Sequence, residues 1–136
     1  MRKVSKPIIF FLVILFPIFR TEESHARASI PDGIIKSIRK GDADGLAAYF
    51  NTSVQLVILE KGNIYSRSQA SMIMKDFFRK NHPRSFAIIH QGGKGNAHYG
   101  IGIMKTDKQN YRIYLLIKPA NKKSYIHQLR IEKENG

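Results

Sequence analysis

Apolar residues recur at helical spacing in three parts of the sequence. The segment 34–38 carries isoleucines at i, i+1 and i+4 and is followed by Gly41, which is typical of a helix end. A second segment, 42–50, begins with an aspartate that can cap a helix. Ser66 and Gln69 have the spacing of a capping box, and the apolar positions after them stay helical until a proline disfavours that geometry. The pattern therefore predicts three helices.

After residue 85 the apolar positions change to a period of two. Alternating segments at 85–91, 97–106, 111–118 and 124–133 predict four strands joined by turns, and a shorter strand pair precedes the third helix. The odd positions of the last three strands are largely apolar, so we expect them to face the helices: Tyr99, Ile101, Ile103, Tyr111, Ile113, Leu115, Ile117, Leu129 and Ile131. This order predicts an α+β fold, with three helices packed on one face of a curved antiparallel sheet of about six strands.

The first 28 residues have the layout of a secretory signal peptide. Three cations precede an apolar run, and alanines stand at 26 and 28, where a signal peptidase requires small residues. The uninterrupted apolar core, 8–16, is much shorter than the roughly 20 residues of a membrane-spanning helix, which makes an uncleaved anchor the weaker alternative. We expect cleavage between Ala28 and Ser29, or after Ala26, and export to the periplasm or beyond. The mature chain, 29–136, is then one domain without a transmembrane segment.

The mature chain is strongly basic. Five of the 23 Lys and Arg residues and two of the ten Asp and Glu residues lie in the first 28 positions, which leaves 18 against 8 and a formal charge of +10. A solvated basic surface is the simplest interpretation, and affinity for an anionic envelope surface is the alternative. Nucleic acid is an unlikely partner for an exported chain without a nucleic-acid-binding motif. Because the chain has no cysteine, no disulfide supports the fold.

The glycine-rich stretch "GGKGN" does not have the spacing of a nucleotide site. A phosphate-binding loop needs Ser or Thr after its lysine, but Lys94 is followed by Gly95 and then by a predicted strand. The dinucleotide fingerprint fails as well, since His98 occupies its third glycine position. We interpret the stretch as a hairpin turn, and we expect no cofactor.

Four segments resemble a family of small exported bacterial proteins of unknown function within the nuclear transport factor 2-like superfamily. They are "ADGLAAYFNTSVQLVI", "IYSRSQASMIMKDFFRKNHPRSFAIIHQG", "YGIGIMKT" and "YRIYLLIK" with "YIHQLRIEK". The resemblance covers roughly residues 30–134. It implies a cone built from a bent sheet around three helices, and it implies no activity by itself.

The superfamily includes ketosteroid isomerase and dehydratase-like enzymes, which place an Asp or His inside the cone. None of the eight acids of the mature chain falls in the middle of a strand on the apolar side. His90 and His127 lie in that register, and with Tyr99 they are our candidate pocket: either an acid–base group or the polar groups of a cavity for a small apolar ligand. We expect no metal site, because few ligands converge. A non-enzymatic domain that binds such a ligand or a macromolecule is the preferred prediction, and an isomerase, dehydratase or hydrolase is the alternative.

The even positions of the strands should face solvent, yet several are apolar. Met104, Tyr114 and Leu116 stand there beside Arg112. Exposed apolar patches rimmed by charge are typical of interfaces. The resemblance implies back-to-back pairing through this face, so we expect a homodimer centred on Tyr114 and Leu116.

Overall fold

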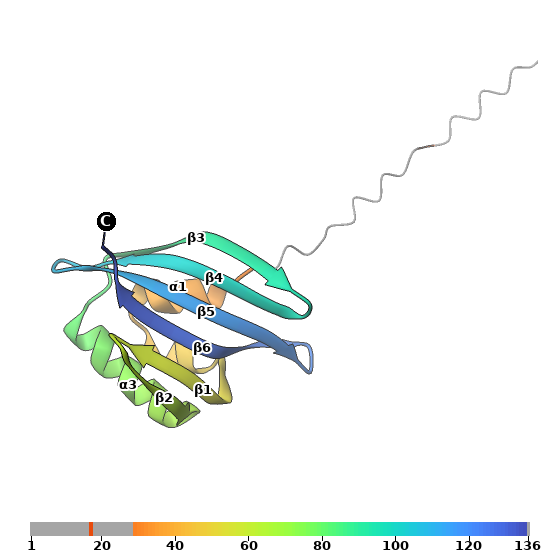
Figure 1. Ribbon diagram of the computed structural model, residues 1–136, viewed down its shortest axis with the longest axis horizontal. Helices are drawn as coiled ribbons and strands as arrows, with labels where there is room; N and C mark the ends of the chain where they lie inside the picture. Colours follow the sequence, from red (N-terminus) through yellow and green to blue (C-terminus); the bar gives the residue numbers. More distant parts are fainter. Residues whose placement is uncertain (1–16, 18–28, 136) are drawn as a thin grey trace, which may run out of the picture.

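The computed structural model describes residue 17 and residues 29–135 of the chain (Figure 1). The other residues of the expected signal peptide, and the alanine before the expected cleavage point, lie outside the described residues. In the described part, no helix is both long enough and apolar enough to cross a membrane.

The three expected helices are present, but the second is shorter than expected: it ends at Ala47, and Phe50 begins the first strand instead. Their bounds are α1 Asp32–Lys40, α2 Ala43–Ala47 and α3 Arg67–Lys80. Gly41 closes α1 with a φ of 66°, a left-handed conformation that glycine adopts without steric cost. The Asp42 carboxylate caps α2 by accepting a hydrogen bond of 2.9 Å from the Gly45 N–H. Ser66 and Gln69 form the predicted capping box at the start of α3.

Six strands form one sheet in the order β2-β1-β6-β5-β4-β3. Their bounds are β1 Phe50–Ile58, β2 Lys61–Ser66, β3 Ser85–Lys94, β4 Ala97–Lys105, β5 Asn110–Ala120 and β6 Lys123–Lys133. The last four strands form the predicted antiparallel meander. The expectation of a purely antiparallel sheet is wrong at one place, because β1 pairs with β6 in parallel.

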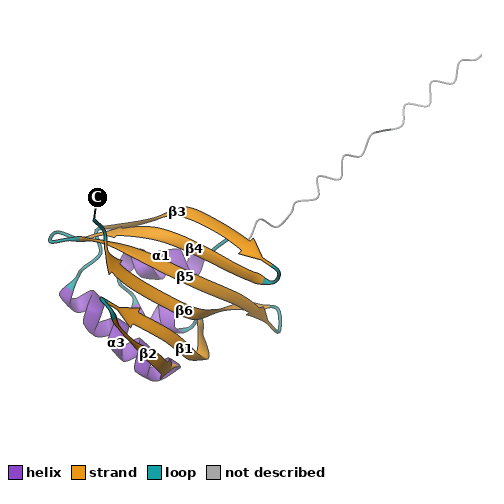
Figure 2. Cartoon of the chain, in the orientation of Figure 1, coloured by secondary structure: helices purple, strands orange, loops and turns teal. Residues whose placement is uncertain are grey.

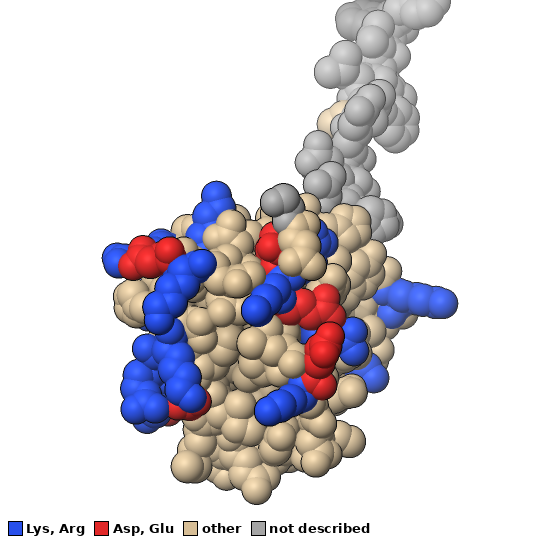
Figure 3. All heavy atoms as spheres, turned by 60° about the vertical axis from the view of Figure 1, so that its left-hand side comes forward, with Lys and Arg blue, Asp and Glu red and all other residues tan. Residues whose placement is uncertain are grey.

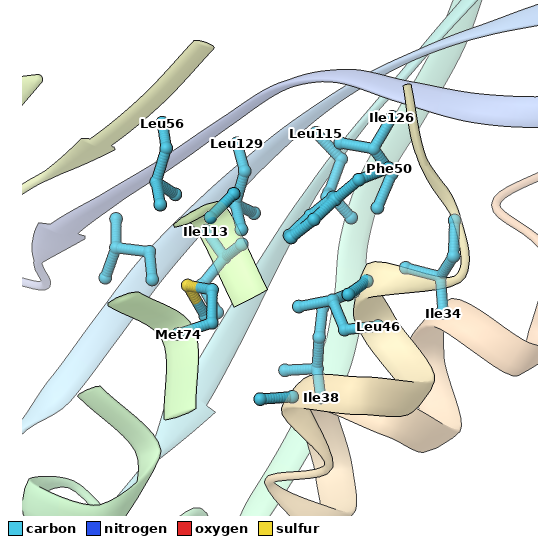
Figure 4. Packing of buried hydrophobic residues seen from close by; sticks show 14 of the residues in the cluster. Ile34, Ile38, Leu46, Phe50, Leu56, Met74, Ile113, Leu115, Ile126 and Leu129 are labelled. Carbon is cyan, nitrogen blue, oxygen red and sulfur yellow. The ribbon is translucent and has the colours of Figure 1, made fainter. Parts of the chain in front are cut away.

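The helices lie on one face of the curved sheet, with α3 placed between β2 and β3 in the chain (Figures 1 and 2). Buried side chains from both layers fill the space between them, and Phe50 and Met74 point into its middle (Figure 4). Phe50, Met74 and Ile113 are all 0% exposed. The interior of the cone is therefore a packed core in the described domain.

Candidate functional site

The two faces of β4 are the reverse of what its sequence suggests. Gly100, Gly102 and Met104 face the core, and Met104 is 0% exposed. The prediction that Met104 belongs to the outer side is therefore wrong. Bulky neighbours explain the inversion: a Cβ on Gly100 would come within 2.7 Å of Ile30 Cγ1, and a Cβ on Gly102 would overlap the ring of Phe86. Glycines on the inner side leave room for these two core side chains.

As a consequence, the odd residues of β4 lie on the outer side of the sheet. Tyr99 is 41% exposed, and Ile101 and Ile103 are only half-buried. The expectation that these three residues face the helices is wrong.

A β-bulge turns His90 away from the core. Ile88 pairs with Gly102 on the inner side, but His90 pairs with Ile101 on the outer side, so Ile89 is an extra residue between them. An uninterrupted strand would have kept His90 in the register of the buried Phe86. The bulge thus removes His90 from the interior.

A second bulge lies at His127. Ile117 pairs with Ile126 on the inner side and Leu116 pairs with Gln128 on the outer side, which leaves His127 as the extra residue. Partial burial lowers the pKa of His127 below its ordinary value, and the positive charge of Lys118 lowers it further. His127 is thus a half-buried histidine that resists protonation.

His90 and Tyr99 lie together, but on an open surface. The Tyr99 hydroxyl is 3.5 Å from Nε2 of His90, and the two ring centroids are 5.8 Å apart. His90, Tyr99 and His127 line none of the three surface hollows of the described residues that are considered below. Since small-molecule sites are concave and enclose most of their ligand, the three residues do not form the expected pocket in this structure.

His98 is the histidine on the inner side of the sheet, which the sequence pattern missed. It pairs with the buried Ile117, and its Nδ1 is buried without a hydrogen-bond partner among the described residues. The shared register of His98 with Gly100, Gly102 and Met104 is the signal that identifies its face. No group of three or more His, Asp or Glu side chains in the described domain is arranged to hold a metal ion.

The outer face of the sheet consists of three cross-strand rows. Strand pairing defines them as His90–Ile101–Tyr114–Arg130–Val57, Tyr99–Leu116–Gln128–Gln55–Ile64 and Ala87–Ile103–Arg112–Glu132. Near its centre, apolar side chains come from β4 and β5: Ile101, Ile103, Tyr114 and Leu116. Ile64 at the β2 end of the second row is 68% exposed. We use the name outer face for these three rows.

Both arginines of the outer face have a glutamate partner. Arg112 donates two hydrogen bonds to Glu134, of 2.7 and 3.0 Å, and these bonds hold the pKa of the Glu134 carboxyl below its ordinary value. Arg130 lies 3.5 Å from Glu132. The centre of this face is therefore close to neutral, although the domain as a whole is strongly basic.

A shallow hollow of about 220 Å³ lies on the outer face, lined by Tyr114, Leu115, Leu116, Gln128 and Arg130. The candidate dimer residues Arg112, Tyr114 and Leu116 all lie on this face and are partly buried. Two other hollows lie elsewhere on the surface, one beside the β1–β2 turn and one between α2 and the start of α3. The outer face is the one of these three places where apolar side chains extend over several strands.

The comparisons with known proteins agree with this fold. A protein-family model described as "Domain of unknown function (DUF4783)" matches residues 31–132. The crystal structure of a DUF4783 family protein from Bacteroides ovatus is similar at 31% sequence identity, with a TM-score of 0.75 over 79% of this chain and 97% of that chain. The search of curated proteins finds no match.

More distant structures share the fold alone. A domain of unknown function with a cystatin-like fold from Nostoc punctiforme has 12% identity and a TM-score of 0.62, over 77% of this chain and 73% of that chain. An NTF2-like protein of unknown function from Shewanella baltica has 9% identity and a TM-score of 0.61, over 77% and 88%. The fold is α+β and similar to that of nuclear transport factor 2, with a six-stranded sheet.

Proposed function

This chain belongs to the DUF4783 family, as the sequence resemblance indicated, and on that premise we propose that it is an exported, non-enzymatic association domain. Its partner is a second copy of the same chain, bound through the outer face. The observation that carries the proposal is the apolar, locally neutral centre of that face.

The packed interior favours association over the binding of a small apolar ligand. Phe50, Phe86 and Met104 are at most 1% exposed, and they occupy the space that a ligand would need between sheet and helices. The solvent-exposed His90 and Tyr99 also lack the enclosed surroundings in which an acid–base pair acts efficiently. These observations favour a protein surface as the functional element.

The charge distribution favours a second copy as the occupant. Each mature chain carries a formal charge of +10, so most faces of two copies repel one another. On the outer face, Arg112 and Arg130 are already neutralised by glutamates. Two outer faces therefore approach without a direct like-charge contact.

The side chains of the outer face also suit a twofold contact. Tyr99, whose ring lies over Gly92 of β3, is the direct cross-strand neighbour of Leu116, which lines the hollow. A twofold contact needs only one self-complementary patch, and Tyr99 and Leu116 supply an aromatic and an aliphatic side chain next to each other for it. A stable interface of this kind buries on the order of 1,200–2,000 Å² in total.

Sedimentation of residues 29–136 tests the proposal. We expect a dimer that tightens as salt screens the repulsion between the two basic chains. Leu116→Glu places a carboxylate in the hollow and converts the protein to a monomer. Met72→Glu is the matched control, since Met72 is 73% exposed on α3, far from the sheet face, and should leave the dimer intact. A wild-type monomer at high protein concentration, or a dimer that Leu116→Glu leaves unchanged, contradicts the proposal.

Export is tested separately. N-terminal sequencing of protein recovered from outside the cytoplasm should give a chain that begins at Ser29 or Arg27. A full-length chain retained in the membrane fraction would instead support the uncleaved anchor.

A further inference from the structure

Two hairpin turns lie next to each other at one end of the sheet. Gly95 lies in the β3–β4 turn, and Asn121 and Lys122 form the β5–β6 turn, at the end opposite the C-terminus (Figure 1). Four lysines stand on these turns and on the strand ends that carry them: Lys94, Lys118, Lys122 and Lys123. We call these four residues the lysine edge.

The strands and turns that carry the lysine edge have no Asp or Glu near it to neutralise its charge. The chain contains no acid between Asp76 and Asp107, and none between Asp107 and Glu132. Asp107 lies in the β4–β5 turn and Glu132 near the end of β6, both at the opposite end of the sheet. In the described domain, no lysine of the edge lies within ion-pair distance of an Asp or Glu.

The opposite end of the sheet has a different arrangement. There Arg84 binds Asp107 at 2.6 Å and Arg112 binds Glu134 at 2.7 Å. On the side that Figure 3 brings forward, acidic and basic side chains lie next to one another. The lysine edge therefore carries four cations and no acid, whereas the opposite end of the meander combines cations with acids.

The lysine edge is exposed and displayed on tight turns. All four lysines are exposed. Asn121 and Lys122 have φ values of 49° and 65°, and lysine adopts this left-handed region only at a conformational cost. The backbone thus presents the ammonium groups on a well-defined turn.

The described chain also begins at this end of the sheet. The Ile30 N–H donates a hydrogen bond of 3.3 Å to Oε1 of Gln91, and Ile30 packs over Gly100, close to the β3–β4 turn. Ile30 therefore lies near the end of the sheet that carries the lysine edge.

We propose that the lysine edge docks the domain on an anionic phospholipid surface. An anionic membrane attracts basic groups within about a Debye length of its headgroups, and each lysine adds to the attraction. The four lysines without acidic partners lie on two neighbouring turns and their strand ends. They can contact a flat array of phosphates when the strands are oriented perpendicular to the membrane. This inference does not depend on pairing through the outer face.

Vesicle flotation with residues 29–136 tests the proposal. Solved relatives consist almost entirely of the matched region, 97% in the Bacteroides ovatus structure, so this region folds on its own. We expect binding to phosphatidylcholine vesicles that contain phosphatidylglycerol, little binding to phosphatidylcholine alone, and loss of binding at about 1 M salt, where the Debye length is about 3 Å.

Paired substitutions locate the surface. The double substitution Lys118→Gln with Lys123→Gln should lower the partition coefficient about 25-fold, because each lysine contributes a factor of about five. Lys105→Gln with Lys108→Gln removes the same charge from exposed positions at the opposite end and should have a much smaller effect. Equal losses for the two pairs, or no binding to anionic vesicles at low salt, would overturn the proposal. Binding of inorganic polyphosphate through the lysine edge without vesicle binding would also overturn it, in favour of a soluble polyanion.

Discussion

The inner and outer faces of the sheet contain similar residues but have different surroundings. Ile113 and Leu115 of β5 are at most 2% exposed beneath the helices, while Tyr114 and Leu116 of the same strand remain partly exposed on the other side. On β4, Tyr99, Ile101 and Ile103 lie outside, whereas Gly100 and Gly102 lie inside. The comparison teaches that the helices and the side chains of neighbouring strands decide which face is the core, not the apolar content of a single strand.

The largest expected effect is the difference in stability between two variants that each place a glutamate on one face of the sheet. Met104→Glu puts an acid among buried side chains, and a fully buried acid shifts its pKa by up to about 3–5 units, which costs about 4–7 kcal/mol of stability. Domains of this size have only about 5–15 kcal/mol in total, so this variant should be largely unfolded at neutral pH. Circular dichroism during urea titration measures the loss.

Leu116→Glu is the matched variant on the outer face. It should keep the fold and lose about 1 kcal/mol or less, because its carboxylate remains in contact with water. If both variants are equally stable, or if Leu116→Glu is the one that unfolds, the assignment of the two faces is wrong.

An intermediate effect is expected for Gly102→Ala. The added methyl group overlaps the ring of Phe86, and overpacking of this kind typically costs about 1–3 kcal/mol. A second substitution, Phe86→Leu, should cost less in the Gly102→Ala background than in the wild type, because it removes the overlapping ring. Thermal unfolding of the four proteins gives this coupling.

Gly95→Asn is the control for the loss of a glycine. It lies in a turn at φ 61° with no atom within 4 Å of a built Cβ, and asparagine tolerates that conformation, so stability should change little. A Gly102→Ala protein as stable as the Gly95→Asn protein would show that Phe86 does not occupy the space beside Gly102.

Local sequence patterns were sufficient for the order of elements. The capping box at Ser66, the glycine after α1 and the period of two after residue 85 each depend on neighbours a few residues away, and the structure confirms all three. The family resemblance was confirmed as well, since the family model matches residues 31–132, and distant solved structures share the fold.

Interactions between distant parts of the chain account for what the sequence did not predict. Each of the two bulges inserts one residue although alternation continues on both sides of it; the first moves His90 to the outer face, and the second leaves His127 without a cross-strand partner. The face of β4 depends on Ile30 and Phe86, which come from other elements. The parallel pairing of β1 with β6 likewise joins two ends of the chain. Strand parity alone was therefore wrong about the face of His90 and Tyr99, and it missed the bulge at His127.

The smallest expected effect on stability is the pH dependence that the half-buried His127 contributes. Its pKa is lowered in the folded state, so the folded protein binds fewer protons than the unfolded chain in this range. The stability contribution is therefore fully present above the ordinary histidine pKa of about 6.5 and is lost as pH falls through the lower folded value. The carboxylates with lowered pKa values, Asp76, Asp107 and Glu134, titrate at more acidic pH. Unfolding midpoints compared between about pH 7.5 and 5.5 should fall in the wild type and fall less in His127→Gln. A His127→Gln protein with an unchanged slope would mean that partial burial at the β6 bulge does not disfavour the charged imidazole.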